Sequence, residues 1–271
     1  MPVEWFRSIH GICFDIDDTF SSHGQIRPEA FSALWSLRDA GFLLIPVTGR
    51  PAGWCDHIAR FWPVHAVVGE NGAFVMAFHG GKLHRVETLG EKKSLAARKK
   101  IHKLWPIVKK KFPKAHQASD QSYRNYDLAI DIGEDVKRWT DKEIDRLIDV
   151  CEKTGAHAKL SSIHVNAWYG DYTKWDGLQC CIKKVLPKIL PKILKSAGKS
   201  TELPLENLIY AGDSPNDEPL FQRFEKSVGV ANLKNYLSRL KFPPTVMTEN
   251  ESGQGFAELA QKLLQARSLS S

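Results

Sequence analysis

Short apolar runs alternate with amphipathic stretches in the N-terminal part of the chain. Ile9–Ile16 and Phe42–Val47 are almost continuously apolar, which is typical of strands buried on both faces of a parallel sheet. Between them, Pro28–Ala40 carries apolar residues at helical spacing, and Gly41 follows at a position suited to a helix C-terminus. A second helix and a short strand, His65–Val68, come next. This alternation predicts an open parallel α/β sheet.

The pattern changes after Glu70-Asn71-Gly72. Two apolar stretches flank His79-Gly80-Gly81 and predict a hairpin. We then expect a helix over Lys92–Phe112, interrupted at Pro106, followed by strand Leu128–Ile132, helix Asp141–Cys151 and strand Ser162–Trp168. This α+β order predicts a module over residues 83–172, which we call the insert, within a core made of residues 1–82 and 173–271.

Buried strands and helices alternate again after the insert. We expect a helix over Trp175–Leu186, strands over Leu208–Ala211, Ser227–Val230 and Thr245–Met247, and a final helix over Gly255–Ala266. The sequence Pro-Lys-Ile-Leu occurs twice in Pro187–Leu194, and a proline every four residues removes helical hydrogen bonds. A kinked or extended connector is therefore expected there.

The composition is that of a folded protein. Of its 271 residues, 42% are hydrophobic, which is enough to bury a core and excludes disorder over most of the chain. No apolar run approaches the ~20 residues that a membrane span needs, and the N-terminus lacks the basic and apolar regions of a signal peptide. The five cysteines show no CxxC spacing. We therefore expect a cytoplasmic protein with reduced thiols and no membrane partner.

Positive charge is concentrated in two runs. The formal net charge is +7, and Lys92–Lys114 carries ten Lys or Arg residues and no acid. Lys183–Lys199 carries six more lysines, again without an acid. Such runs favour an anionic partner, such as a phosphorylated metabolite, a nucleic acid or an acidic surface. They are equally compatible with solvated helix faces.

Carboxylates follow two of the predicted buried strands. Asp15 and Asp17 come at the end of the first strand, where alternate residues point to the same side. Asp213 and Asp217 follow the first strand after the insert. Ligands of open α/β sheets bind at the carboxyl edge of the strands, and Mg²⁺ prefers oxygen donors. The sequence therefore predicts an Mg²⁺ site, although a capping box from Ser214 to Asp217 also explains part of the second group.

Four segments carry a resemblance to a known family. The four motifs of haloacid dehalogenase-like phosphatases are similar, in order and spacing, to Asp15-Ile16-Asp17-Asp18-Thr19, Val47-Thr48-Gly49-Arg50, Lys174 and Gly212-Asp213-Ser214-Pro215-Asn216-Asp217. The resemblance covers nearly the whole chain and implies a Rossmann-like α/β core. The insert resembles the α+β cap of the subgroup that contains sucrose-phosphate, trehalose-phosphate and mannosyl-phosphoglycerate phosphatases and phosphomannomutase. The chain departs from that subgroup at Asp18, where glycine is usual, and in the residues after Lys174.

This resemblance implies Mg²⁺-dependent hydrolysis of a small phosphorylated metabolite, a sugar phosphate, through an aspartyl-phosphate. Asp15 would be the nucleophile, and Asp17 would protonate the leaving oxygen and then activate water. Mg²⁺ would be held by Asp15, Asp213 and the carbonyl of Asp17. Thr48, through its hydroxyl and backbone N–H, and Lys174 would bind phosphoryl oxygens. The supporting residues expected around them are Gly49, Arg50, Asn216 and Asp217, the last orienting Lys174 or a metal-bound water.

The insert offers side chains near its predicted strand ends that could read the substrate. These are Arg124, Tyr126, His164, Asn166 and Trp168. Trp168 could stack on a sugar ring or belong to a core, and Arg124 could contact the substrate or be an ordinary surface arginine. Asp18 is expected to be a surface turn residue.

Two other functions fit parts of the sequence. A phosphomannomutase-like phosphotransferase would share the motifs and would require a bisphosphate activator. A nucleic-acid-binding protein, or a phosphatase of nucleic-acid ends, would use the basic runs, with which Trp105, Phe112 and Tyr123 interleave. Zinc-site spacings, GxSxG, a Walker A loop and GxGxxG are absent from the sequence, which disfavours zinc enzymes, serine hydrolases, P-loop proteins and dinucleotide binding.

Overall fold

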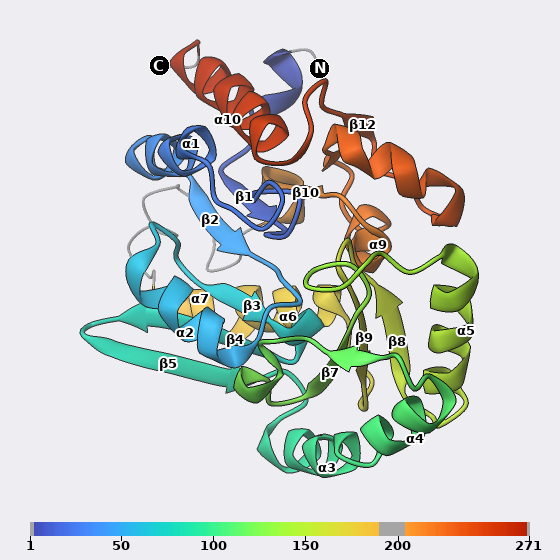
Figure 1. Ribbon diagram of the computed structural model, residues 1–271. Coiled ribbons are helices and arrows are strands. Elements are labelled where there is room, and N and C mark those ends of the chain that lie inside the picture. The colour runs from blue at the N-terminus through green and yellow to red at the C-terminus, as the bar shows by residue number, and fades with distance from the viewer. Residues whose placement is uncertain (1–2, 190–203, 270–271) are drawn as a thin grey trace.

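A five-stranded parallel sheet forms the centre of the core (Figure 1). The computed structural model describes residues 3–189 and 204–269. The strand order is β12-β11-β10-β1-β2 and every neighbouring pair is parallel, which confirms the sheet expected from the sequence. Its strands are β1 (Gly11–Phe14), β2 (Leu43–Pro46), β10 (Leu208–Gly212), β11 (Ser227–Gly229) and β12 (Val246–Met247).

Helices cover both faces of this sheet because successive side chains of β1 point to opposite faces. Ile12 and Phe14 pack in one cluster with α1 (Pro28–Asp39) and α10 (Ser252–Ser268). Cys13 packs in a second cluster on the other face. That face is covered by α6 (Lys174–Cys180), a π-helical turn (Cys181–Val185), α7 (Leu186–Ile189) and α9 (Glu218–Phe221). Burial on both faces accounts for the continuous apolar runs.

A smaller antiparallel sheet extends the core beside β2. It has the order β3-β4-β5, and a parallel bridge between Val47 and Val68 connects it to the main sheet. Its elements are β3 (Val67–Gly69), β4 (Phe74–His79) and β5 (Lys82–Glu87), covered by α2 (Ala52–Phe61). The expected hairpin is therefore present, but the expected start of the insert at residue 83 falls inside β5. The chain leaves this sheet only after Glu87.

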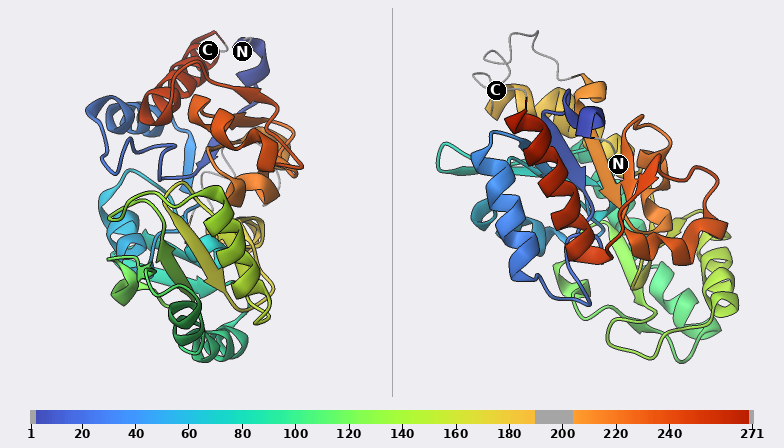
Figure 2. Two further views of the ribbon diagram at one scale, coloured as in Figure 1. Left: turned by 45° about the vertical axis from the view of Figure 1, so that its right-hand side comes forward. Right: turned by 90° about the horizontal axis from the view of Figure 1, so that it is seen from above.

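The insert contains a four-stranded antiparallel sheet with its own hydrophobic core. The strand order is β6-β7-β9-β8, and helices α3 to α5 pack on it, with residues such as Leu104, Leu147 and Val165 in one cluster. In Figure 1 and the left view of Figure 2 the insert lies below the main sheet. Its elements are α3 (Glu91–Ile101), α4 (Leu104–Lys111), β6 (His116–Gln117), β7 (Asp127–Asp131), α5 (Asp141–Glu152), β8 (His157–Leu160) and β9 (His164–Trp168).

Two local expectations for the insert are corrected. The basic helix breaks at His102 and Lys103, and Pro106 lies in the first turn of α4, where a missing N–H costs no helical hydrogen bond. Strands β6 and β8 were not expected from the sequence because both are short. Both residues of β6 are polar, and β8 has polar residues at alternate positions. Thr140 and Glu143 form a capping box that fixes the start of α5.

Among the described residues, the three aromatic residues expected to interleave with the basic runs do not share one surface. Phe112 is buried in the core of the insert and Trp105 packs against it, whereas Tyr123 lies apart, beside α2. In Figure 1, α3 and α4 lie at the end of the molecule opposite the main sheet. The second run, Lys183–Lys199, and the second Pro-Lys-Ile-Leu unit lie largely outside the described residues, and Pro187 of the first unit belongs to α7.

Two further expectations concern the chain as a whole. All five cysteines are buried and free of disulfide bonds, as expected for reduced thiols. Among the described residues, no helix combines the length and apolar character needed to cross a lipid bilayer.

Candidate active site

The carboxyl edge of the main sheet brings the sequence-predicted carboxylates together. Phe14 of β1 pairs with Ala211 of β10, and the N–H of Asp15 donates to the carbonyl of Ala211 at 2.9 Å. Asp15 and Asp213 therefore emerge side by side where the two strands end. Both side chains are buried.

Lys174 lies between the carboxylates of Asp15 and Asp217. It is the first residue of α6 and is only 1% exposed. Its Nζ lies 3.1 Å from Asp15 Oδ1 and 2.7 Å from Asp217 Oδ1, and it donates to Asn216 Oδ1 at 3.2 Å. Burial acts to lower the pKa of Lys174, but Asp15 and Asp217 outweigh it and raise this pKa above its ordinary range. The ammonium is therefore a permanent positive charge next to Asp15.

Asp217 holds this arrangement in place. Besides Lys174, it accepts hydrogen bonds from the hydroxyl of Tyr210 at 2.5 Å and from the N–H groups of Asp213 and Ser214 at 3.0 and 3.1 Å. The capping box at Ser214 is present. It does not account for the whole group, because Asp217 also orients Lys174, as the sequence analysis expected.

The carboxylates fit a divalent cation. Asp15, Asp213 and Asp217 each offer an oxygen within 4.8 Å of the others. Asp213 Oδ1 accepts from the hydroxyl of Thr19 at 2.8 Å, whereas Oδ2 is buried and has no hydrogen-bond partner among the described residues. Burial raises the pKa of Asp15 to about 8 against the opposing charge of Lys174, and burial together with Asp15 holds the pKa of Asp213 well above its usual range. A hard cation would supply the missing positive charge and take the free oxygen.

The loop after β2 carries the second motif. The N–H of Thr48 donates to the carbonyl of Val68 at 2.9 Å, so this N–H belongs to the sheet and is not free for a phosphoryl oxygen, contrary to expectation. The hydroxyl of Thr48 accepts from the N–H of Arg50 at 3.0 Å. At Gly49, a Cβ would lie 3.3 Å from both amide atoms of Asn71, so a side chain would be accommodated only if Asn71 shifted. Thr48 can still contribute its hydroxyl.

Arg50 connects the first motif with the insert. It forms a fork on the carboxylate of Asp17, which is therefore turned to Arg50 and lies outside the carboxylate cluster. It also pairs with Asp120 at 3.2 Å and with Glu134 at 2.8 Å, both from the insert. Glu134 in turn contacts His164 Nε2 at 2.8 Å. Burial acts to raise the pKa of Glu134, but the hydrogen bond with His164 and the charge of Arg50 lower it to about 2. Arg50 thus ties the core to the insert at Asp17.

A strained turn that the sequence analysis did not single out fixes the neighbouring loops. Glu70 and Asn71 have φ values of 42° and 55°, which are rare for residues with side chains. The buried Glu70 carboxylate accepts N–H groups from Ala52 in the core and from Asn125 and Tyr126 in the insert. At Gly72, a Cβ would lie 1.9 Å from the carbonyl of Thr173, the residue before Lys174. Because Gly72 has no side chain, the start of α6 can lie against this turn, and this contact places Lys174.

The substrate-reading residues expected in the insert are mostly committed to the protein. Arg124 is buried and binds Asp120, Asp127 and the carbonyl of Gly49 at 2.8 Å, so it is neither a free substrate ligand nor a surface arginine. Trp168 is 2% exposed and stacks between His157 and Tyr172, which makes it a core residue. Tyr126 is also in the core, His164 holds Glu134, and Asn166 donates to Asp127 at 2.9 Å.

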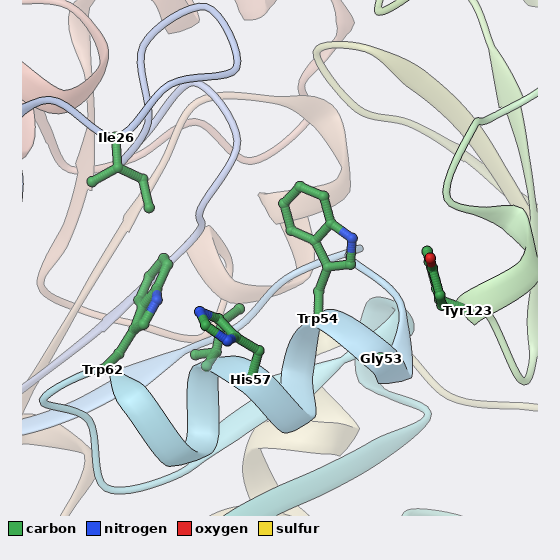
Figure 3. A pocket seen from close by; sticks show the side chains of 7 residues that line it. Ile26, Gly53, Trp54, His57, Trp62 and Tyr123 are labelled. Atoms are coloured by element: carbon green, nitrogen blue, oxygen red, sulfur yellow. The ribbon is translucent and has the colours of Figure 1, made fainter.

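Two cavities reach the region of Asp17 and Arg50. One, of about 630 Å³, is lined by Asp17, by the turn that follows it, and by residues 133–138 and 162–163 of the insert. The other, of about 550 Å³, is an aromatic pocket outside α2 (Figure 3). Its Trp54 ring lies 4.3 Å from the Arg50 guanidinium. The first cavity is the one that opens onto the predicted acid.

Comparison with known proteins agrees with this geometry at the level of the fold. A Thermoplasma acidophilum protein of known structure is 14% identical, with a TM-score of 0.67, over 94% of this chain and 98% of its own. A Synechocystis sucrose-phosphatase, solved with sucrose and phosphate, is 14% identical, with a TM-score of 0.58, over 94% of this chain and 98% of its own. A trehalose-6-phosphate phosphatase related protein gives a TM-score of 0.55 at 14% identity, over 96% and 98%.

Sequence comparison carries the family assignment. No curated relative matches the chain significantly. The profile of the haloacid dehalogenase-like hydrolases, however, matches residues 12–253, which include all four motif segments. The chain therefore belongs to the haloacid dehalogenase-like hydrolases.

Proposed function

We propose that this protein is a phosphatase that hydrolyses a small phosphorylated metabolite, a sugar phosphate, through an aspartyl-phosphate on Asp15. The observation that carries the proposal is the placement of one buried ammonium, Lys174, and one unpartnered buried oxygen, Asp213 Oδ2, around the Asp15 carboxylate. A phosphate monoester dianion repels a carboxylate, so a site that uses one as nucleophile must first neutralise the ester.

The charges around Asp15 meet that requirement. Asp15, Asp213 and the carbonyl of Asp17 would hold Mg²⁺, which when bound would neutralise phosphoryl oxygens. Lys174, the first residue of α6, supplies a second positive charge. The hydroxyl of Thr48 and the N–H of Gly49, next along the chain, would position the phosphoryl group from the second motif.

The chain's own residues then carry two transfers. In the first, a carboxylate oxygen of Asp15 attacks phosphorus, the bond to the leaving oxygen breaks, and that oxygen takes a proton from Asp17. In the second, water attacks phosphorus, its proton passes to Asp17, and the bond to Asp15 breaks. Inorganic phosphate and the free alcohol are the products, and both aspartates return to their starting states.

Phosphate release from 4-nitrophenyl phosphate in the presence of Mg²⁺ tests the proposal. Asp15→Asn is expected to abolish release, because an amide is a poor nucleophile. Asp39→Asn, at the exposed end of α1, is the matched control and should release phosphate at the wild-type rate. Mass spectrometry after an acid quench should find phosphate on the peptide that contains Asp15. Activity of Asp15→Asn within about tenfold of wild type would remove Asp15 as the nucleophile.

A further inference from the structure

Among the charged side chains that line the cavity opening onto Asp17, acids outnumber basic groups, although the chain as a whole is basic. We propose that the leaving group of the substrate is uncharged and rich in hydroxyls, and that Asp18 helps to select it against leaving groups that carry a second anion. This inference rests on the proposed phosphatase function and specifies its substrate class.

Charged residues line the cavity unevenly. The acids are Asp17, Asp18, Glu134 and Asp135, and the basic groups are Arg138 and His23. A smaller adjoining cavity of about 190 Å³ reaches Asp213, and its charged lining consists of Asp18, Asp213 and Glu251 together with His23. Among the described residues, no lysine lines either space. Lys174 would balance the charge of the phosphoryl group, whereas the leaving group would lie among carboxylates.

The one arginine of the lining is already engaged. Arg138 donates through Nη1 to the carbonyl of Ser162 and through Nη2 to the hydroxyl of Tyr236 at 3.0 Å. Glu134 is likewise engaged, by Arg50 and His164. Both acceptors of Arg138 are neutral, so it keeps its charge, and an additional anion in this space would face Asp18 and Asp135 with Arg138 as the one permanent cation of the lining. Hydroxyl groups would instead find acceptors, since ionised carboxylates only accept hydrogen bonds.

Asp18 stands where the two cavities adjoin, since it lines both. Its φ is 53°, a value that glycine adopts freely and that other residues rarely do. The turn holds it firmly: its N–H donates to Ser21 Oγ at 3.2 Å, and its carbonyl accepts from Asn232 Nδ2 at 2.9 Å. Oδ1 accepts from the N–H of His23 at 3.3 Å. Asp18 is a turn residue, as expected, but it also presents a carboxylate to the substrate space.

The first basic run does not line this space. Helices α3 and α4, which carry the first run, lie at the end of the molecule opposite the main sheet (Figure 1). Their lysines do not line either cavity. The positive charge of these two helices therefore lies away from the space around the leaving group.

A matched pair of six-carbon phosphate esters tests the proposal. Sorbitol 6-phosphate and 6-phosphogluconate have the same carbon chain and differ by a carboxylate in place of a terminal alcohol. Wild-type kcat/KM is expected to be at least about tenfold higher for sorbitol 6-phosphate, because the extra carboxylate of 6-phosphogluconate meets like charge in the cavity. Where either ester is turned over too slowly, its inhibition constant against 4-nitrophenyl phosphate gives the same comparison.

Asp18→Asn is the decisive variant because asparagine tolerates positive φ and can still accept from the N–H of His23. It should narrow the preference for sorbitol 6-phosphate several-fold, whereas Asp149→Asn on the exposed face of α5 should leave the preference unchanged. Equal handling of the two esters by wild type, or an unchanged preference in Asp18→Asn, overturns the inference alone. If no ester, including 4-nitrophenyl phosphate, releases phosphate in a way that depends on Asp15, the proposed function is overturned and the inference with it.

Discussion

Arg50 holds the carboxylate of Asp17 in a two-pronged contact. Its Nε lies 3.0 and 2.9 Å from the two carboxylate oxygens, and its Nη2 lies 2.7 Å from Oδ1. The guanidinium is almost fully buried, and burial acts to lower its pKa, but Asp17 and Glu134 outweigh this and raise that pKa further above its ordinary range. A permanently charged, planar fork therefore fixes the orientation of the Asp17 carboxylate in this structure.

Replacing Arg50 by lysine should impair proton transfer more than phosphoryl transfer. Lysine keeps the charge but not the fork, so Asp17 is no longer held in one orientation. An alkyl phosphate needs its leaving oxygen protonated, and we expect its kcat to fall at least about tenfold. 4-Nitrophenyl phosphate has a good leaving group and should lose much less.

The control for this variant is Arg60→Lys, which alters an exposed ion pair with Asp56 on the same helix, α2. It should change neither kcat. An equal loss on the alkyl and aryl esters in Arg50→Lys would mean that Arg50 acts only by joining the core to the insert through Asp120 and Glu134.

Asp213→Asn should weaken Mg²⁺ binding and, without Mg²⁺, should not destabilise the fold. The variant removes one charge of the proposed site and should raise the Mg²⁺ concentration for half-maximal activity at least about tenfold, as even outer-shell changes can. Mg²⁺ should raise the melting temperature of the wild type but not of the variant, because a ligand stabilises the state that binds it. In a chelator the variant should melt no lower than wild type, since one buried like charge is gone.

Equal Mg²⁺ effects on the melting temperature of both proteins would contradict this site. Asp149→Asn provides the control, because Asp149 pairs with Lys153 on the exposed face of α5 and lies outside the Asp15, Asp213 and Asp217 cluster. It should leave the Mg²⁺ dependence unchanged.

The parts of the fold and site that follow from local sequence could be predicted. β1, β2 and β10 are buried on both faces, so their apolar runs are continuous, and Asp15 and Asp213 directly follow two of them. Parallel pairing then makes the two aspartates neighbours without further information.

Features that depend on distant partners could not be predicted. Arg50 meets Asp120 and Glu134, and nothing in the residues around Arg50 indicates which insert acids fold against it. The burial of Trp168 could not be predicted either, because the sequence pattern of an aromatic residue at a strand end is the same whether its side chain faces a ligand or the core. The polar edge strands β6 and β8 become strands only through pairing with β7 and β9.

Arg124→Gln should lower stability rather than substrate preference. The side chain is fully buried among Asp120, Asp127 and the carbonyl of Gly49, and removing it leaves two buried carboxylates short of a partner. Breaking a buried pair in this way costs about 3–5 kcal/mol in the free energy of unfolding. Chemical denaturation should show this loss, with little change for Arg98→Gln on the exposed face of α3. A selective loss of activity on a metabolite, without loss of stability, would return Arg124 to the substrate-binding residues.

His65 should make stability depend on pH between about 6.5 and 3. Its Nδ1 accepts the N–H of Leu44 at 3.1 Å, and burial, with the charge of Arg38, lowers the pKa of the folded-state imidazole to about 3 from 6.5. Above pH 6.5 the ring is neutral in both states and stability is complete. As the pH falls below 6.5, the unfolded chain binds a proton that the folded protein does not, so stability decreases with falling pH.

From pH 7 to pH 5 this single group should lower the free energy of unfolding by about 2 kcal/mol, a figure that follows from the two pKa values. Urea unfolding of His65→Gln should lack that component, because glutamine can accept the Leu44 N–H through its carbonyl but does not titrate. His57→Gln, at an exposed position of α2, should retain the full wild-type dependence. Parallel pH profiles for wild type and His65→Gln would mean that the imidazole is not held neutral, and that the Leu44 N–H finds its acceptor elsewhere.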